Sequence, residues 1–293
     1  MLTQSLANTL FPSGITQLQA LGNSLGVAVA LWVVVVFLGR RFGIVYYGSE
    51  QTSNMGLAYL GLLTLPFVFA PHKLVTFGVV LLLDIWLEKI FSTLGREKHI
   101  FSSFDQGVLL GLLALLHPAF ILIVITYLFL QHYYHNSHKR NVSAFMLGIC
   151  TIFWVIGLLF MPPNLGYLVQ WVTQWSATLL SPSLVRTEAV QWYILFTTGF
   201  ITCCNSVQVY NFQSRALEKH RGHSTGHLCL VWVLFVLYLL FNKEFFLLPL
   251  VYFQAVFMQL FSKVNPKPLH QLLILFPLLI LTALLLYHYF PIL

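Results

Sequence analysis

The chain has 293 residues, of which 58% are apolar and only 8% are charged. An average soluble protein is roughly 25% charged, so this chain has too few charged side chains to cover a soluble fold of its size. The composition therefore excludes soluble, disordered, fibrous and disulfide-rich secreted proteins. It indicates a single integral membrane domain, residues 1–293, whose first partner is the lipid bilayer.

Basic residues outnumber acidic ones by 15 to 8. In a membrane protein Lys and Arg mark the cytoplasmic loops, so the charge gives no reason to expect a nucleic-acid partner. The four cysteines lie in apolar runs, where cysteine packs as a small side chain, and we expect no disulfide. Residues 1–17 carry no charged side chain. We therefore expect the first apolar run to remain a membrane helix rather than to act as a cleaved signal.

Apolar runs follow one another along the whole chain, and a helix needs about 20 apolar residues to cross the hydrocarbon core. The runs lack the alternation of a membrane β-barrel. The predicted fold class is therefore all-α, a polytopic transmembrane helical bundle of about 8–10 membrane helices. In chain order the runs are Leu18–Leu38, Met55–Ala70, Leu74–Phe91, Asp105–His117, Pro118–Tyr134, Ser143–Met161, Ala189–Val209, His227–Phe241, Phe245–Ser262 and Leu269–His288.

The region Asp105–Tyr134 is either one long span or a hairpin broken at His117-Pro118. If the chain returns to the same side, twelve basic residues lie on one side of the membrane and three on the other, whereas a single crossing leaves seven and eight. We therefore predict a helical hairpin at 105–134 and place both termini on the non-cytoplasmic side. Its arms are short, so the hairpin either crosses twice or is re-entrant. The predicted cytoplasmic loops are 39–54, 92–104, 135–142, 210–226 and 263–268.

The segment Asn164–Leu180 is apolar but carries scattered polar residues. Leu168, Trp171 and Trp175 fall near one face of a helix there. An amphipathic helix of this kind lies in the plane of a membrane interface. We therefore expect an interfacial helix on the outer side, or else a partial span.

Glycines occur in two different settings. Gly22/Gly26 and Gly107/Gly111 have the small-xxx-small spacing that lets helix backbones approach closely, so we expect both pairs to pack against other helices. The segment Arg221–Gly226, by contrast, combines Gly with Ser and Thr. That composition is typical of a loop, and we predict one there.

Asp84 is the only carboxylate well inside a predicted span, and Glu88 follows one helical turn later on the same face. A charge inside the bilayer costs at least about 2.5–3.5 kcal/mol on insertion scales, so it requires a compensating contact or a role. Two interpretations stay open. The pair forms a proton or cation site or an acid–base pair, or it forms a partly protonated polar clasp with Lys89 near the headgroups.

His117 precedes Pro118 at the predicted tip of the hairpin. Proline lacks a backbone N–H and disfavours helix at the residue before it. The imidazole therefore either bonds freed backbone groups or lines a substrate path. At the start of the hairpin, Ser103 or Asp105 is the predicted N-cap of a helix, with Gln106 completing a capping box.

Histidines gather at two predicted cytoplasmic positions. Zinc sites need an organised set of three or four ligands, and a loop at 221–226 would not provide it. We therefore expect no metal and a weakly basic surface that meets anionic headgroups. The chain also has no P-loop, dinucleotide-binding or HExxH motif, so no cofactor is expected. The two groups are His132, His135, His138 and His220, His223, His227.

Arg186 and Glu188 are the charged pair of the longest predicted outer connection. They either hold a phosphate or sugar ligand or simply flank an interfacial helix. Uncharged polar side chains also occur in or near the spans, where interhelical hydrogen bonds stabilise helix pairs. These are Gln191, Asn205, Gln208, Gln254 and Gln259.

The stretch between residues 90 and 160 contains Phe104, Gly107, the run Leu112–Pro118, Lys139-Arg140, Ala144-Phe145 and Gly148. With these residues the stretch resembles an uncharacterised polytopic inner-membrane protein family of Bacteroidota. This resemblance implies a bacterial inner membrane and no particular activity. The run Leu113–Pro118 is also similar to segments of polysaccharide polymerases and lipid-linked glycosyltransferases. Those glycosyltransferases usually place acidic residues in an early outer loop, and this chain has none at 71–73 or before Leu18.

Three classes of function follow, and whether the chain is an enzyme stays open. The favoured one is a non-catalytic component of an envelope-assembly or export complex in the bacterial inner membrane, with other envelope proteins as partners. The alternative is a membrane-embedded lipid-linked glycan transferase or polysaccharide polymerase, using Arg186/Glu188 outside or Asp84/His117 inside. The second alternative is a transporter that uses Asp84 and the broken hairpin, although the internal repeat of many transporters is missing.

Overall fold

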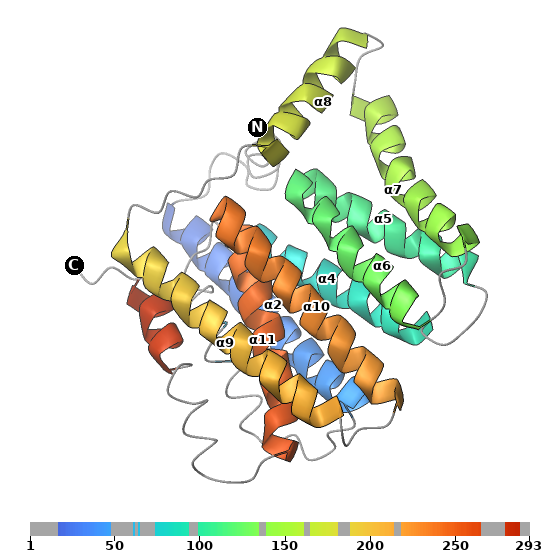
Figure 1. Ribbon diagram of the computed structural model, residues 1–293. Helices are drawn as coiled ribbons and strands as arrows, with labels where there is room; N and C mark the ends of the chain where they lie inside the picture. The colour runs from blue at the N-terminus through green and yellow to red at the C-terminus, as the bar shows by residue number, and fades with distance from the viewer. Residues whose placement is uncertain are drawn as a thin grey trace.

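The computed structural model describes residues 17–47, 61, 64, 74–93, 99–134, 139–160, 165–180, 188–213, 218–264 and 279–287 (Figure 1). Within these residues the regular structure is helical throughout and contains no strand, so the all-α prediction is confirmed. The helices are α2 (Gln17–Tyr47), α4 (Leu74–Thr93), α5 (Ile100–Leu116), the 3₁₀ helix η2 (Pro118–Ile123), α6 (Val124–Tyr133), α7 (Lys139–Phe160), α8 (Leu165–Leu180), α9 (Ala189–Gln213), α10 (Glu218–Phe241) and α11 (Glu244–Val264).

Two of the described helices are long and apolar enough to cross a membrane. They are Lys139–Gly157 within α7 and Arg221–Phe241 within α10. Shorter apolar helices cover Ile100–Leu116, Pro118–Tyr133 and Phe245–Phe257. The predicted run Met55–Ala70 and much of Leu269–His288 lie outside the described residues.

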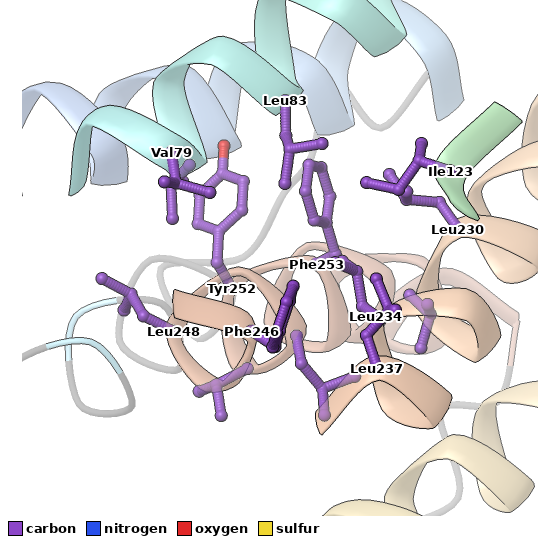
Figure 2. Packing of buried hydrophobic residues seen from close by; sticks show 14 of the residues in the cluster. Val79, Leu83, Ile123, Leu230, Leu234, Leu237, Phe246, Leu248, Tyr252 and Phe253 are labelled. Carbon is purple, nitrogen blue, oxygen red and sulfur yellow. The ribbon is translucent and has the colours of Figure 1, made fainter. Parts of the chain in front are cut away.

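Helix α11 occupies the centre of the bundle. Every side chain from Phe246 to Phe257 is buried. A helix that is apolar on all sides is buried, either in a protein core or in a membrane. Here α2, α4, α9 and α10 pack around α11. In Figure 2, Tyr252 and Phe253 of α11 point toward Val79 and Leu83 of α4.

The predicted break at His117-Pro118 is confirmed. Helix α5 ends at Leu116, His117 is extended with φ −154° and ψ 126°, and η2 begins at Pro118. Proline at the first position of η2 needs no N–H partner, which suits a helix start. From there the chain reverses, and α6 runs in roughly the opposite direction to α5, with η2 packed against α5 (Figure 1). The region 105–134 is therefore a hairpin of two short arms.

Glycines set the distance between α5 and α7. A Cβ atom on Gly107 would lie 2.0 Å from the carbonyl oxygen of Phe145, and one on Gly148 would lie 2.2 Å from that of Phe104. The predicted packing at Gly107/Gly111 is therefore confirmed. The prediction for the other pair is wrong at Gly26, where an added Cβ would meet nothing within 4 Å, because α2 turns that position outward.

Helix α10 begins earlier than predicted. The segment 221–226 is helical, so the prediction of a loop there is wrong. A Cβ on Gly222 would overlap the ring of Tyr134, and one on Gly226 would lie 2.4 Å from Leu130. The glycines therefore let α10 approach α6 closely, and this packing outweighs their low helix propensity.

Helix ends gather in two groups, which we call the basic end and the tip end. At the basic end α2, α4 and α6 finish while α5, α7 and α10 begin (Figure 1). At the tip end α5 and α10 finish while α9 and α11 begin (Figure 1). The 17 residues of α5 separate the two ends by about 25 Å at 1.5 Å per residue. Basic side chains at the basic end are Arg40, Arg41, Lys89, Lys139, Arg140 and Arg221, whereas Lys243 lies at the tip end.

A two-residue turn joins α10 to α11 at the tip end. Asn242 has a positive φ of 47°, a conformation that asparagine tolerates better than most residues. Its N–H donates to the carbonyl oxygen of Tyr238 at 2.9 Å, which closes the end of α10. Its side chain donates to Oε1 of Gln191 at 3.3 Å and so connects the turn to α9.

Candidate functional site

Asp84 lies in the interior, where α4 meets α11. Its side chain is 3% exposed and its Oδ1 accepts a hydrogen bond from the hydroxyl of Tyr252 at 3.2 Å. Tyr252 is itself fully buried. A buried carboxylate is stable only when donors face it, so the pair positions α4 against the central helix.

The other charges of α4 point to different helices. Glu88 accepts from the guanidinium of Arg41 on α2 at 3.3 Å. Lys89 lies 2.6 Å from Oδ2 of Asp105 on α5. Adjacent residues on a helix point about 100° apart, so Glu88 and Lys89 face different helices. Lys89 therefore pairs with Asp105 on α5 and does not join Asp84 and Glu88 in the predicted clasp.

The start of α5 differs from its predicted form. His99 is the N-cap residue, and Ser103 and Asp105 lie inside the helix, so the predicted capping box is wrong. Asp105 forms an ion pair with Lys89. The Gln106 side chain donates to the carbonyl oxygen of Lys89 at 3.2 Å. These partners on α4 stabilise an earlier helix start than local sequence indicates.

His117 lies at the tip of the hairpin and is 8% exposed. Its Nδ1 accepts from the backbone N–H of Ala119 at 3.2 Å, which caps η2. Its ring also meets Phe241 and Phe246 edge-on, with centroids 5.4 and 5.1 Å away. His117 therefore accepts a hydrogen bond from a backbone N–H that the helix break leaves without a helical partner. This is the first of the two interpretations given above.

The second histidine group becomes an internal feature once α10 extends to Glu218. His223 and His227 are spaced one turn apart and both are buried. Nε2 of His227 donates to the carbonyl oxygen of Phe253 at 3.1 Å, and His223 lies against Phe91. The expectation of a surface that meets headgroups is therefore wrong for these two. In the described part of the chain, no three His, Cys, Asp or Glu residues gather as metal ligands would.

Arg186 lies outside the described residues, so its predicted pairing with Glu188 has no structural description. Glu188 is exposed and directly precedes α9 at the tip end. Its carbonyl oxygen accepts from the N–H of Gln191 at 3.1 Å, in the first turn of that helix. Helix α8 also reaches the tip end, because Nε1 of Trp175 in α8 donates to the carbonyl oxygen of Ala114 near the end of α5 at 3.4 Å.

A polar cluster between α9 and α11 joins Gln254, which was among the polar residues noted in the sequence, to Thr198 and Thr202, which were not. Nε2 of Gln254 donates to the carbonyl oxygen of Thr198 at 2.9 Å and to Oγ1 of Thr202 at 2.7 Å. The interhelical hydrogen bonds predicted for Gln254 are therefore present. By contrast, Gln191 bonds to the turn residue Asn242, and the Asn205 side chain has no partner among the described residues. The signal in the sequence was the spacing of Thr198, Thr202 and Asn205 on one helix face.

The chain was compared with protein-family models, curated proteins and solved structures, and it matches none of them.

Proposed function

We propose that this chain is a multi-pass protein of the bacterial inner membrane and serves as a non-catalytic component that assembles or anchors an envelope complex. The observation that carries the non-catalytic role is that its polar candidates make contacts with other parts of the fold. Asp84 accepts from Tyr252, Glu88 pairs with Arg41, and His117 caps η2. The first two contacts each join two helices, and the third caps the 3₁₀ helix at the hairpin tip. All three are structural roles.

The outward faces of the helices support a membrane location. In α7 the span Lys139–Gly157 has a mean hydropathy of 1.5, yet only 28% of an 18-residue stretch within it is buried. Leu147 and Trp154 of this helix are 62% and 70% exposed. Soluble monomers rarely expose contiguous apolar surface of this kind, whereas a lipid-facing helix requires it.

The two groups of helix ends support the proposed orientation. The helices that border the predicted loops 39–54, 92–104 and 135–142 begin or end at the basic end. Lys and Arg are enriched in cytoplasmic loops. The basic end is then cytoplasmic, and the tip end with His117, Glu188 and α8 is the outer side. Both chain termini fall on the outer side in this arrangement.

Reporters of sidedness test the membrane part of the proposal. We expect a reporter inserted after Asn136 to be cytoplasmic, and reporters after Ser183 and at the C-terminus to be outside. The chain should also stay in the membrane pellet after alkaline carbonate washing. Detection of Asn136 and the C-terminus on the same side would contradict the arrangement.

Purification from native membranes in a mild detergent tests the non-catalytic part. We expect a protein partner in fixed stoichiometry by native mass spectrometry, retained by both the wild type and Asp84→Asn. Turnover of lipid-linked glycan by the purified protein would instead favour the enzyme. Ion-driven uptake in proteoliposomes that Asp84→Asn abolishes at unchanged thermal stability would favour the transporter.

A further inference from the structure

One face of α9 carries three polar residues on successive turns. Thr198, Thr202 and Asn205 follow one another at intervals of four and three, and all three are 0% exposed. Residues at these intervals share a helix face. The face is directed toward α11, whose Gln254 is 1% exposed and reaches across to α9. We call these four residues the α9–α11 amide cluster.

The hydrogen bonds within the cluster fix the orientation of the Gln254 amide. Its nitrogen donates to the carbonyl oxygen of Thr198, which can only accept, so the amide cannot be reversed. The second N–H donates to Oγ1 of Thr202, and that hydroxyl donates in turn to the carbonyl oxygen of Thr198 at 2.9 Å. Both amide hydrogens of Gln254 are therefore used, and its Oε1 points elsewhere.

Three buried polar atoms of the cluster have no hydrogen-bond partner among the described residues. They are Oε1 of Gln254 and both Oδ1 and Nδ2 of Asn205. Asn205 lies three residues beyond Thr202, a rise of about 4.5 Å along α9. Thr202 accepts from Gln254, so Asn205 lies about one helical turn along α9 from a residue that Gln254 contacts. Buried amides in proteins are nearly always bonded, to protein or to ordered water.

We infer that the α9–α11 amide cluster is a binding site for a small neutral molecule that both donates and accepts hydrogen bonds, namely water. The two oxygens require donors and Nδ2 requires an acceptor. A water molecule supplies both, and buried waters typically make about three hydrogen bonds. A cation would satisfy the oxygens and face the Nδ2 hydrogens, while an anion would do the reverse. The bound water joins α9 to the central helix beside the direct bonds of Gln254.

Asn205→Leu in the full-length protein tests the inference, because leucine has nearly the shape of asparagine without its polar atoms. If water satisfies the amide, the substitution removes two hydrogen bonds, and Tm in detergent should fall by about 2–4 °C. If the site is dry, leucine removes two unsatisfied groups and Tm should rise, which would overturn the inference. Thr197→Val is the matched control on α9, because its hydroxyl bonds only within its own helix. It should leave Tm unchanged.

A double-mutant cycle tests whether Asn205 and Gln254 share one ligand. We expect the decrease in Tm caused by Asn205→Leu to be at most half as large in a Gln254→Met background, because the water has then already lost its hydrogen bond to Gln254. Equal falls in both backgrounds would overturn a shared site. If Asn205→Leu does not fold, Asn205→Ser takes its place, and a Tm above that of the wild type would again mean a dry site.

The choice between water and a cation is tested by salt. Tm of the wild type should be the same in sodium chloride and in choline chloride at equal ionic strength. If Tm increased in sodium chloride only, and Asn205→Leu abolished that increase, the assignment of water would be overturned and a cation site indicated.

Discussion

The hydroxyl of Tyr252 on α11 donates to Oδ1 of Asp84 on α4 at 3.2 Å, across 168 positions of sequence. The bond connects the central helix to the one deeply placed acid that the sequence identifies. It also explains how a carboxylate is accommodated there, since a donor faces it inside the fold. The candidate for proton or cation chemistry is thus also a structural contact between two helices.

Replacement of Tyr252 by Phe removes only the hydroxyl, and the acid then keeps its burial without this donor. We expect the free energy of unfolding to fall by about 1–3 kcal/mol, measured by thermal or chemical unfolding in detergent. Tyr193→Phe on α9 is the control, because that ring is 61% exposed. Equal stability of the two variants would show that the Tyr252–Asp84 bond contributes nothing.

The crossing of α5 and α7 depends on the absence of a side chain at Gly148. Gly148→Ala would place a carbon 2.2 Å from the carbonyl oxygen of Phe104, so the helices must move apart. We expect a loss of about 1–3 kcal/mol or more, as for other overpacked sites. Gly157→Ala lies on the same helix with open space around it and should be neutral or stabilising by up to about 1 kcal/mol. A similar loss in both variants would contradict a role for the crossing.

The tip of the hairpin should be sensitive to the cap at His117. His117→Ala removes the acceptor for the N–H of Ala119, and we expect unfolding to become easier by about 0.5–2 kcal/mol. Asparagine is a good N-cap residue, so His117→Asn should recover part of this loss. Recovery by Phe instead of Asn would indicate that the contacts with Phe241 and Phe246 dominate.

The pair Lys89–Asp105 should matter little despite its short distance of 2.6 Å. The two side chains are 41% and 53% exposed, and exposed ion pairs typically contribute less than about 1 kcal/mol. Lys89→Met should therefore shift Tm only slightly, and the shift should shrink in high salt because salt screens the pair. A salt-independent loss of several kcal/mol would show that Lys89 has another role.

The sequence by itself determined the all-helical class and the position at which the helix is interrupted, at His117-Pro118. With 8% charged residues and long apolar runs, few other classes of fold are available. Proline at 118 has no N–H to donate, which makes a helix end at Leu116 predictable from local chemistry alone. The spacing of Gly107 and Gly111 also predicted their close packing, but the same spacing at Gly22/Gly26 gave a wrong prediction at Gly26, so glycine permits a close approach without determining it.

The tertiary structure alone decided which residues meet. The partner of Asp84 comes from a helix 168 positions away, and no local pattern marks Tyr252 as a donor. Glu88 and Lys89 are neighbours in sequence but pair with α2 and α5, because their directions on α4 differ. The segment 221–226 has the composition of a loop yet forms helix, because close packing against α6 stabilises it. Local chemistry fixes where helices can begin and end, whereas packing between distant segments selects the contacts of each polar side chain.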